Sequence, residues 1–351
     1  MKTKKLFIAG LIVSAILFIA ACAMVAVSAV VSKQEMDLGI DLSGYNVTKM
    51  HTDNETIRVF GTQDGEVFAS DLEGEMLWDA GAFYTSPVYE LAVEGGDVFV
   101  VYANGNVVRF SLEYAASIEE GESFSEASVY SIGTSFNTNG NVKNTQLIVV
   151  PEEETFYLRG VFNDISQINR IYRFEYGTET PQRLVGTSNS VGGMAYSEGS
   201  TVYAVSAEGG VTSLQNVNET IVALSCFENA LSLVTAQNNL FILPEYGAGT
   251  PQNYALSVSL NSEYVFSTGE NFTAKINNGG VAMIDSSSHS VTLSMRASDS
   301  LNLIMWTDES FVLYNAADLN NPTITYYSSD LARSKEVFST LLYVFIAVAL
   351  A

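Results

Sequence analysis

The sequence is poor in cysteine. Only Cys22 and Cys226 occur, and Cys22 falls within an apolar leader, so the remaining chain cannot form an internal disulfide. Stability must therefore come from a hydrophobic core. The length permits this, because a domain of roughly 300 residues buries roughly 75% of the surface that its unfolded chain exposes.

Basic residues are also scarce, at 16 against 39 acidic residues, and the formal net charge is −23. Three of the 16, Lys2, Lys4 and Lys5, lie at the N-terminus, and no acidic residue occurs among residues 1–32. The remainder therefore has 13 basic residues against all 39 acidic ones. Such a surface repels nucleic-acid phosphates and anionic lipid headgroups, which excludes nucleic-acid binding.

Patterns for catalysis or metal binding are missing as well. The two histidines, His51 and His289, are far apart, and neither lies in a motif such as His-Glu-x-x-His. The sequence has no Gly-x-Ser-x-Gly elbow, P-loop or dinucleotide fingerprint. Acidic clusters at residues 71–75, 119–122 and 152–154 lack the ligand spacing of a calcium loop, and we interpret them as solvated loops. The sequence thus predicts no catalytic, cofactor-binding or metal-ligating residue.

A long apolar leader follows the N-terminal lysines. Residues 6–31 are uncharged, and as a helix they would span roughly 39 Å, more than the roughly 30 Å core of a bilayer. The apolar part of a cleaved signal peptide is about 7 to 15 residues long, so we predict a transmembrane helix. The positive-inside rule then places residues 1–5 in the cytoplasm and the main domain outside it. Lipidation at Cys22 and cleavage at residues 27–29 are the alternatives.

The chain closes with a second apolar run. Residues 341–351 would span roughly 17 Å as a helix, about half of a bilayer. We therefore predict that residues 337–351 are the truncated start of a second transmembrane helix, in a larger integral membrane protein. The alternative is a short helix that packs on the domain or lies at the membrane surface. A disulfide-free domain outside the membrane is common in bacteria, so we expect a bacterial cell envelope.

Residues 37–330 show an all-β pattern. Short runs rich in Val, Ile, Phe, Tyr and Thr alternate with clusters of Gly, Asn, Asp and Ser, without sustained helical periodicity. Two runs flank Asp64-Gly65, and the unit recurs around Asn104-Gly105. These dipeptides suit tight hairpins, in which both central positions need positive φ. Weaker copies raise the number to seven, with turn centres near residues 65, 105, 166, 209, 239, 279 and 309.

The hairpins recur about every 41 residues on average, and repeats of about 40–50 residues with four strands are typical of β-propeller blades. We predict an all-β, seven-bladed β-propeller. Six or eight blades, or a pair of β-sandwiches, are the alternatives. Because a propeller ring closes on itself, its termini lie close together, which suits a domain between two membrane helices.

One segment carries a family resemblance. Residues 64–78, DGEVFASDLEGEMLW, resemble the repeat of quinoprotein-type (PQQ-like) and WD40-like propellers, in which a Gly-x-Val-Tyr-Ala-x-Asp strand is followed by a turn and a Leu-Trp strand. The match is good for this one blade and supports the fold. Quinone-dependent members hold their cofactor with a calcium ion, a catalytic Asp and often a vicinal disulfide. No adjacent cysteines occur here, so the resemblance implies no cofactor.

These expectations combine into a hypothesis about function. The chain would be a membrane-tethered, extracytoplasmic β-propeller that acts as a non-catalytic recognition or sensor domain of an ABC-type transport permease or a signalling protein. Its partners would be the membrane and other envelope proteins; the sequence names no small-molecule ligand. Two alternatives stay open. An envelope enzyme would need a ring of carboxylates and polar groups at the central channel, and an assembly scaffold would expose unpaired strand edges or a hydrophobic patch.

Overall fold

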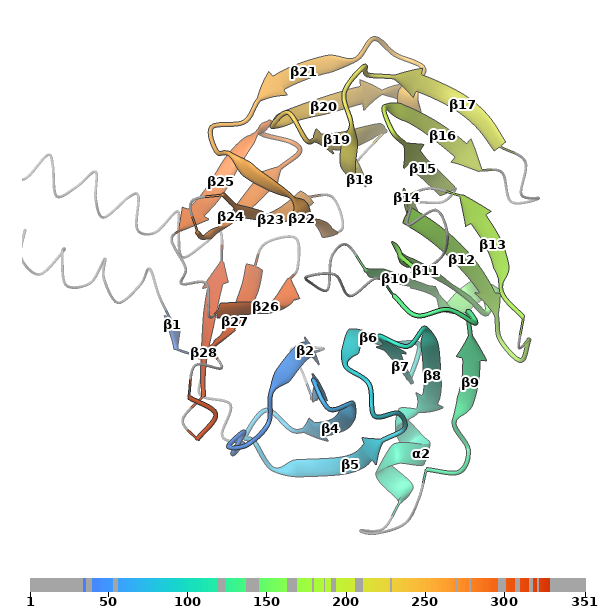
Figure 1. The fold of residues 1–351 in the computed structure, drawn as a ribbon, viewed down its shortest axis with the longest axis vertical. Helices are drawn as coiled ribbons and strands as arrows, with labels where there is room; N and C mark the ends of the chain where they lie inside the picture. The colour runs from blue at the N-terminus through green and yellow to red at the C-terminus, as the bar shows by residue number, and fades with distance from the viewer. Residues whose placement is uncertain are drawn as a thin grey trace, which may run out of the picture.

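The computed structural model contains seven four-stranded antiparallel sheets, arranged as blades around a ring (Figure 1). The expected membrane segments, residues 6–31 and 337–351, lie outside the residues that the structure describes. Among the described residues, no helix has the length and apolar character needed to cross a bilayer. The described residues are 34–35, 40–52, 56–118, 124–136, 145–162, 169–178, 180–185, 187–190, 194–205, 211–227, 229–268, 271–277, 279–295, 301–306, 310–315, 318–320 and 322–328.

Each blade is built from strands that follow one another in the chain, and the first strand of each blade lies nearest the centre of the ring (Figure 1). The antiparallel order and the short turns follow from the alternation of apolar and polar residues between Gly- and Asn-containing turns. From the inside outward, blades 1 to 3 are β2 (Val47–Thr52), β3 (Arg58–Thr62), β4 (Glu66–Ser70) and β5 (Met76–Ala82); β6 (Val88–Glu94), β7 (Asp97–Tyr102), β8 (Asn106–Ser111) and β9 (Ser128–Ser131); and β10 (Gln146–Val150), β11 (Thr155–Val161), β12 (Asn169–Glu175) and β13 (Gln182–Val185).

The second half of the ring repeats this order. Its last blade is completed by the first strand of the chain, β1. Blades 4 to 7 are β14 (Thr187–Ser190), β15 (Met194–Glu198), β16 (Thr201–Val205) and β17 (Val211–Asn216); β18 (Ile221–Phe227), β19 (Ala230–Thr235), β20 (Asn239–Pro244) and β21 (Gln252–Ala255); β22 (Leu260–Thr268), β23 (Asn271–Ile276), β24 (Val281–Asp285) and β25 (Ser290–Met295); and β26 (Leu301–Trp306), β27 (Ser310–Asn315), β28 (Thr323–Ser328) and β1 (Gln34–Glu35).

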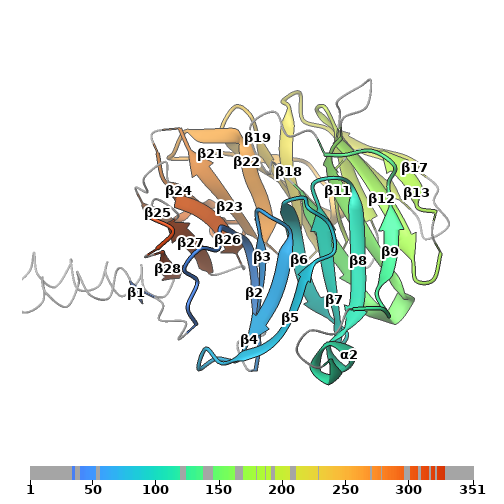
Figure 2. The ribbon, with the colours of Figure 1, turned by 60° about the horizontal axis from the view of Figure 1, so that its bottom comes forward.

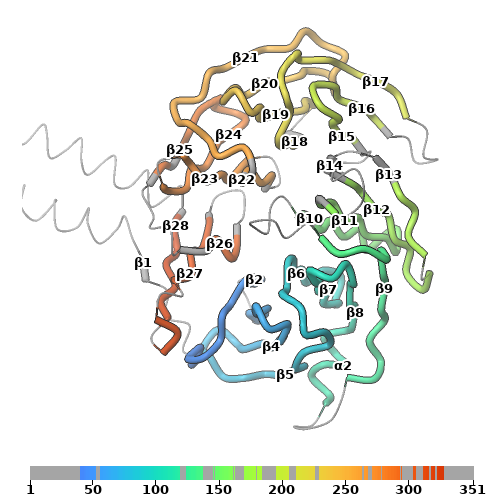
Figure 3. Tube along the Cα trace, viewed as in Figure 1, coloured from blue at the N-terminus to red at the C-terminus, as the bar shows by residue number. Residues whose placement is uncertain are grey.

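The ring is closed by pairing between the first and the last strand of the chain. In β1, Gln34 pairs with Tyr326 and Glu35 with Thr325 of β28. The colour of the chain runs once around the ring (Figures 2 and 3), and the blue β1 lies beside the red β28 (Figure 1). Strand β1 begins at Gln34, a few residues before the predicted start of the domain at residue 37.

The prediction of a seven-bladed all-β propeller is confirmed, and each predicted hairpin lies in a different blade. In five blades the predicted hairpin is the central pair of strands. In blade 4 it is instead the outer pair, β16 and β17, and in blade 7 the inner pair, β26 and β27. The central turn of blade 4 lies at Gly199, which has a positive φ of 60°. These two shifts contribute to the uneven spacing of the predicted turns.

The described residues contain three short helical segments within the propeller, where the sequence predicts only strands and turns. The α-helix α2 (Leu112–Ser117) leaves the end of β8, and two 3-10 turns, η1 (Pro151–Glu153) and η2 (Glu245–Gly247), follow β10 and β20. The hydroxyl of Ser111 caps α2 by accepting a hydrogen bond from the backbone N–H of Tyr114 at 3.0 Å. A helix of six residues is too short to show a 3.6-residue period, so sequence periodicity missed it.

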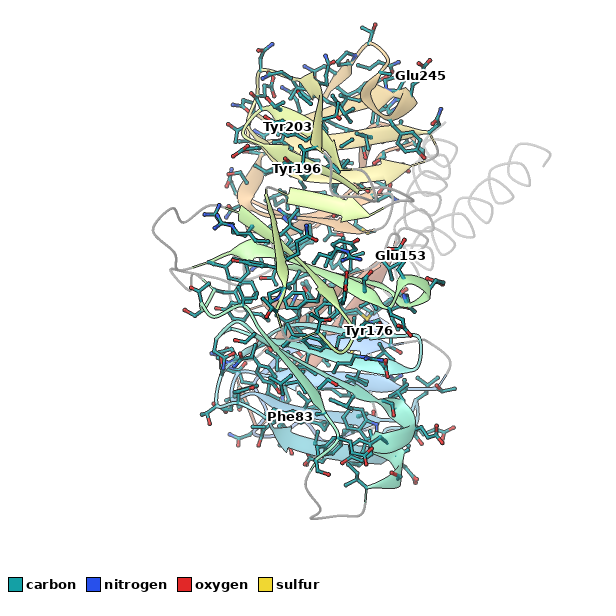
Figure 4. The ribbon with its side chains drawn as sticks, turned by 90° about the vertical axis from the view of Figure 1, so that its right-hand side faces the viewer. Phe83, Glu153, Tyr176, Tyr196, Tyr203 and Glu245 are labelled. Carbon is teal, nitrogen blue, oxygen red and sulfur yellow. The ribbon has the colours of Figure 1, made fainter. Side chains whose placement is uncertain are left out.

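The hydrophobic core lies between neighbouring blades. The interface of blades 2 and 3 is rich in aromatic residues, and Phe156 and Phe174 stack there with ring centres 4.5 Å apart. The interface of blades 3 and 4 has fewer buried apolar side chains among the described residues. It contains Ile171 and Tyr196, and Tyr196 stacks on Tyr203 at 5.0 Å (Figure 4). Packing of this kind makes each blade depend on both neighbours for burial of its two faces.

Candidate functional site: the outer strand of blade 1

The innermost strands carry few carboxylates. Of the seven, only β6 and β22 contain acidic residues, and the other five contain mainly Ser, Thr, Asn and apolar residues. An envelope enzyme, the alternative considered above, would need a ring of carboxylates at the central channel. These strands do not supply one.

The inner strands β2 and β6 are joined by a buried ion pair. Lys49 Nζ lies 3.2 Å from Oε2 of Glu90, with side-chain exposures of 4% and 12%. Burial raises the pKa of Glu90 and lowers the pKa of Lys49, and the attraction between the two charges opposes both shifts. Beside the pair, the hydroxyl of Thr48 donates to the carbonyl of Val88 at 2.8 Å. These contacts connect blades 1 and 2, and their burial suits a structural role.

The histidines and the acidic clusters that the sequence singles out are not brought together. His51 lies on β2 of blade 1, whereas the ring of His289, in blade 6, stacks on Tyr254 at 4.1 Å. The described part of the chain contains no group of three or more His, Cys, Asp or Glu side chains placed to hold a metal ion.

The acidic clusters occupy separate turns. Asp71 shapes the turn between β4 and β5, because its Oδ1 accepts hydrogen bonds from the backbone N–H groups of Glu73 and Glu75 at 2.9 and 2.8 Å. Glu152 and Glu153 lie in η1 and Glu154 follows it, and residues 119–122 lie outside the described residues. Burial, together with the nearby charge of Glu152, raises the pKa of Glu94. The negative charges of Glu94 and Glu152 therefore repel each other.

Among the outer strands whose side chains are all described, which are β5, β9, β17 and β21, β5 exposes the most large apolar residues. Met76 is 49% exposed and Leu77 48% exposed. The pairing of β5 with β4 shifts register here: Ala69 pairs with Trp78, and Ser70 pairs with Met76. Leu77 is therefore the extra residue of a β-bulge. The bulge explains why two consecutive large side chains are half exposed, where a regular strand would alternate.

The other edge of β5 is open in the described structure. Its backbone pairs with β4, and no other strand pairs with it there. Because outermost strands carry N–H and C=O groups directed away from the sheet, such an edge is a template for pairing with another chain. At its far end, the N–H of Gly81 donates to Asp79 Oδ1 at 2.8 Å, so the open part of the edge precedes Gly81.

An aromatic cluster supports β5 on the side of blade 2. Trp78 contacts Phe110 and Phe124 with ring-centre distances of 5.6 and 6.3 Å, and Phe83 contacts the same two rings at 5.6 and 5.7 Å. Helix α2 packs against both β5 and β8. Figure 4 shows Phe83 among these blades. Packed aromatic rings hold their neighbours in place, so the outer strand has a rigid base.

The surroundings of β5 are strongly acidic. Residues 59–108 include no Lys, Arg or His and nine Asp or Glu residues. Burial, followed by the charges of Asp79, Glu66 and Asp41, raises the pKa of Tyr45, whose ring contacts Phe68 at 4.7 Å. Tyr45 is therefore close enough to Asp79 of β5 to be affected by its negative charge.

Sequence reasoning did not identify this surface. The resemblance of residues 64–78 predicts a strand at the Leu-Trp part, and β5 lies there, but exposure of Met76 and Leu77 depends on a bulge that the sequence does not reveal. The available signal was the absence of basic residues between positions 59 and 108.

No protein family and no curated protein sequence matches this chain. Solved structures are similar to it in fold. BamB from Moraxella catarrhalis has a TM-score of 0.52 at 12% identity, with 84% of this chain and 98% of that chain covered. The β-propeller domain of Cps50 (Swd1) from Myceliophteria thermophila has a TM-score of 0.59 at 10% identity, with 84% and 99% covered.

An enzyme shares the fold as well. Virginiamycin B lyase from Staphylococcus aureus has a TM-score of 0.54 at 10% identity, with 84% of this chain and 98% of that chain covered. At such identities the likeness shows the β-propeller fold alone, and one fold serves many functions. The function of this chain has to be argued from its own surface.

Proposed function

We propose that this chain is a non-catalytic protein-recognition domain, held outside the cytoplasm by its N-terminal apolar segment as part of a larger integral membrane protein. The observation that carries the proposal is the open edge of β5, with half-exposed Met76 and Leu77 on a rigid aromatic base. A β-propeller is compatible with such an interaction or scaffold role. The inner strands add support, because they lack the repeated carboxylates of a catalytic channel.

A photo-crosslinking experiment in cells tests recognition. A photoreactive amino acid replaces Leu77 in blade 1, Val211 in blade 4 or Glu245 in η2, all exposed residues. At least one position is expected to give a discrete adduct with another protein, which unlabelled full-length chain reduces by competition. If no position gives such an adduct, the recognition role is wrong.

We also propose that the propeller is built from quinoprotein-type (PQQ-like) repeats. The segment at residues 64–78 supports it, because the structure places its first part on β4 and its Leu-Trp part on β5, joined by a turn in which Gly74 has a φ of 93°. We propose a bacterial envelope for the domain, since it needs no disulfide and is strongly acidic. In a permease, several hydrophobic helices would follow codon 351, whereas in a signalling protein one helix and a cytoplasmic domain would follow.

Cysteine labelling is expected to place the domain outside the membrane. In a chain with Cys22→Ser and Cys226→Ser, the exposed Ser288 is replaced by cysteine. A membrane-impermeant maleimide should label Ser288→Cys on intact cells, because residues 1–5 carry the positive charges that stay inside. The control Thr3→Cys should react only after lysis. Labelling of Ser288→Cys only after lysis would contradict the proposed orientation.

A further inference from the structure

We infer that β5 is a docking edge for an extended, basic segment of a partner protein, which adds a fifth strand to blade 1. The inference rests on the proposed recognition function and names the partner's chemistry. Addition of a peptide strand to an open sheet edge is a general mode of recognition, in which backbone hydrogen bonds give affinity and side chains give specificity.

The backbone of β5 is long enough to pair with an extended segment of another protein. β5 has seven residues and therefore extends over roughly 24 Å, since an antiparallel strand rises about 3.4 Å per residue. A partner segment of similar length would pair along residues 76–80, ahead of the N–H of Gly81, which Asp79 already engages. The aromatic cluster around Trp78 fixes the position of the strand. Bulges at Leu77 and Ala80 interrupt its regular pairing, so the added strand would have to follow this bent edge.

The side chains select an apolar contact. Met76 and Leu77 each keep about half of their surface exposed, and an added strand at the usual spacing of about 4.8 Å would cover part of both. Strands β9, β17 and β21 offer less. Val129 is the one large exposed apolar residue on β9 and Val211 the one on β17, while β21 has none. Strand β5 alone among these four combines two such side chains with an open edge.

The charges select a basic partner. Glu73, Glu75 and Asp79 are exposed beside the two apolar residues. The guanidinium of Arg58, which donates to the carbonyl of Leu72 at 3.1 Å, can offset at most one of these three charges. A partner strand with Lys or Arg would bring opposite charges opposite one another, which favours pairing. A second copy of this chain pairing β5 on β5 would bring carboxylates together. An anionic lipid surface would be repelled in the same way.

A peptide binding assay tests the inference with the full 351-residue chain in a mild detergent. The probe is a fluorescent ten-residue peptide of alternating lysine and valine. A matched peptide with every second amide N-methylated keeps the charge and the side chains but cannot pair along one edge. The chain variants are Met76→Lys/Leu77→Lys and, as a matched control, Val211→Lys on β17.

The unmodified peptide is expected to bind the wild type and Val211→Lys equally. Binding to Met76→Lys/Leu77→Lys should be weaker by about tenfold or more, because apolar contact is lost and like charges face one another. The melting temperature should stay within about 2 °C, since both side chains are half exposed. N-methylation should weaken binding to the wild type by a similar factor.

Four outcomes would overturn the inference. Equal binding of the N-methylated peptide would reduce the contact to charge attraction alone. Equal binding to the β5 variant would place the site elsewhere. Self-association of the chain that is abolished by Met76→Lys/Leu77→Lys would identify a second copy as the occupant. Crosslinked adducts at Val211 or Glu245 but none at Leu77 would leave the recognition function standing and remove β5 as its site.

Discussion

Replacing Lys49 with methionine is expected to lower the free energy of unfolding by about 3–5 kcal/mol, because it leaves a buried carboxylate without its counter-charge. Lys49 Nζ lies 3.2 Å from Oε2 of Glu90, and both side chains are almost fully buried. The effect would be measured by urea denaturation of the full chain, as a lower midpoint at an unchanged slope.

The double variant Lys49→Met/Glu90→Leu is the control. Replacing both members of a buried pair by apolar residues is often neutral or stabilising, so the double variant should recover most of the lost stability. It still loses the weak bond from the N–H of Leu91 to Glu90 Oε1 at 3.3 Å. A double variant as unstable as Lys49→Met would show that packing of the lysine stem, and not the unpaired charge, causes the loss.

The loss should also depend on pH. Burial already raises the pKa of Glu90 above its ordinary value of 4.5, and without Lys49 we expect a further rise. Between about 4.5 and the folded-state pKa, the folded protein then holds one proton that the unfolded chain has lost. Stability therefore falls as pH rises, by at most about 1.4 kcal/mol per pH unit. The deficit of Lys49→Met should be smallest at acid pH, and a deficit that grows toward acid pH would contradict this explanation.

The propeller could be predicted from the sequence because its signals are local. Gly65 and Gly105 adopt positive φ, 92° and 85°, but Asp64 and Asn104 before them do not, so the expectation of positive φ at both central positions is wrong for these turns. Each turn still lies between two runs of strand-forming residues. Such dipeptides report the turn without any knowledge of the rest of the fold. The number of blades followed from the spacing of the hairpins. The position of a hairpin within its blade did not, because inner, central and outer pairs of strands use similar turns.

The candidate site depends on contacts between distant segments, which local patterns do not contain. Lys49 and Glu90 are 41 positions apart, and they meet because neighbouring blades place their first strands side by side at the centre. A lysine and a glutamate in alternating strands would each be expected to face water. Likewise, Met76 and Leu77 are both half exposed only because of the bulge beside Trp78.

Gly105→Ala is expected to lower the free energy of unfolding by about 3 kcal/mol, from a strained positive φ of about 1–2 kcal/mol and a steric clash of about 1–3 kcal/mol. Gly105 has a φ of 85°, and an added Cβ would lie 2.0 Å from the carbonyl oxygen of Thr134. The neighbouring chain cannot move freely. The N–H of Ile132 donates to the carbonyl of Gly105 at 3.1 Å, and the N–H of Phe136 to the carbonyl of Ala103 at 2.9 Å.

Gly96→Ala separates strain from clash. Gly96 lies in the same blade and has a φ of 83°, but a Cβ there would meet no atom within 4 Å. Both substitutions remove the same conformational freedom from the unfolded chain, so that effect cancels in the comparison. We expect Gly96→Ala to cost about 1 kcal/mol, and the difference between the two variants in urea denaturation measures the clash with Thr134. Equal losses would mean that the segment from Ile132 to Phe136 yields without cost, and that the contact between the central turn of blade 2 and this segment contributes little to holding the ring together.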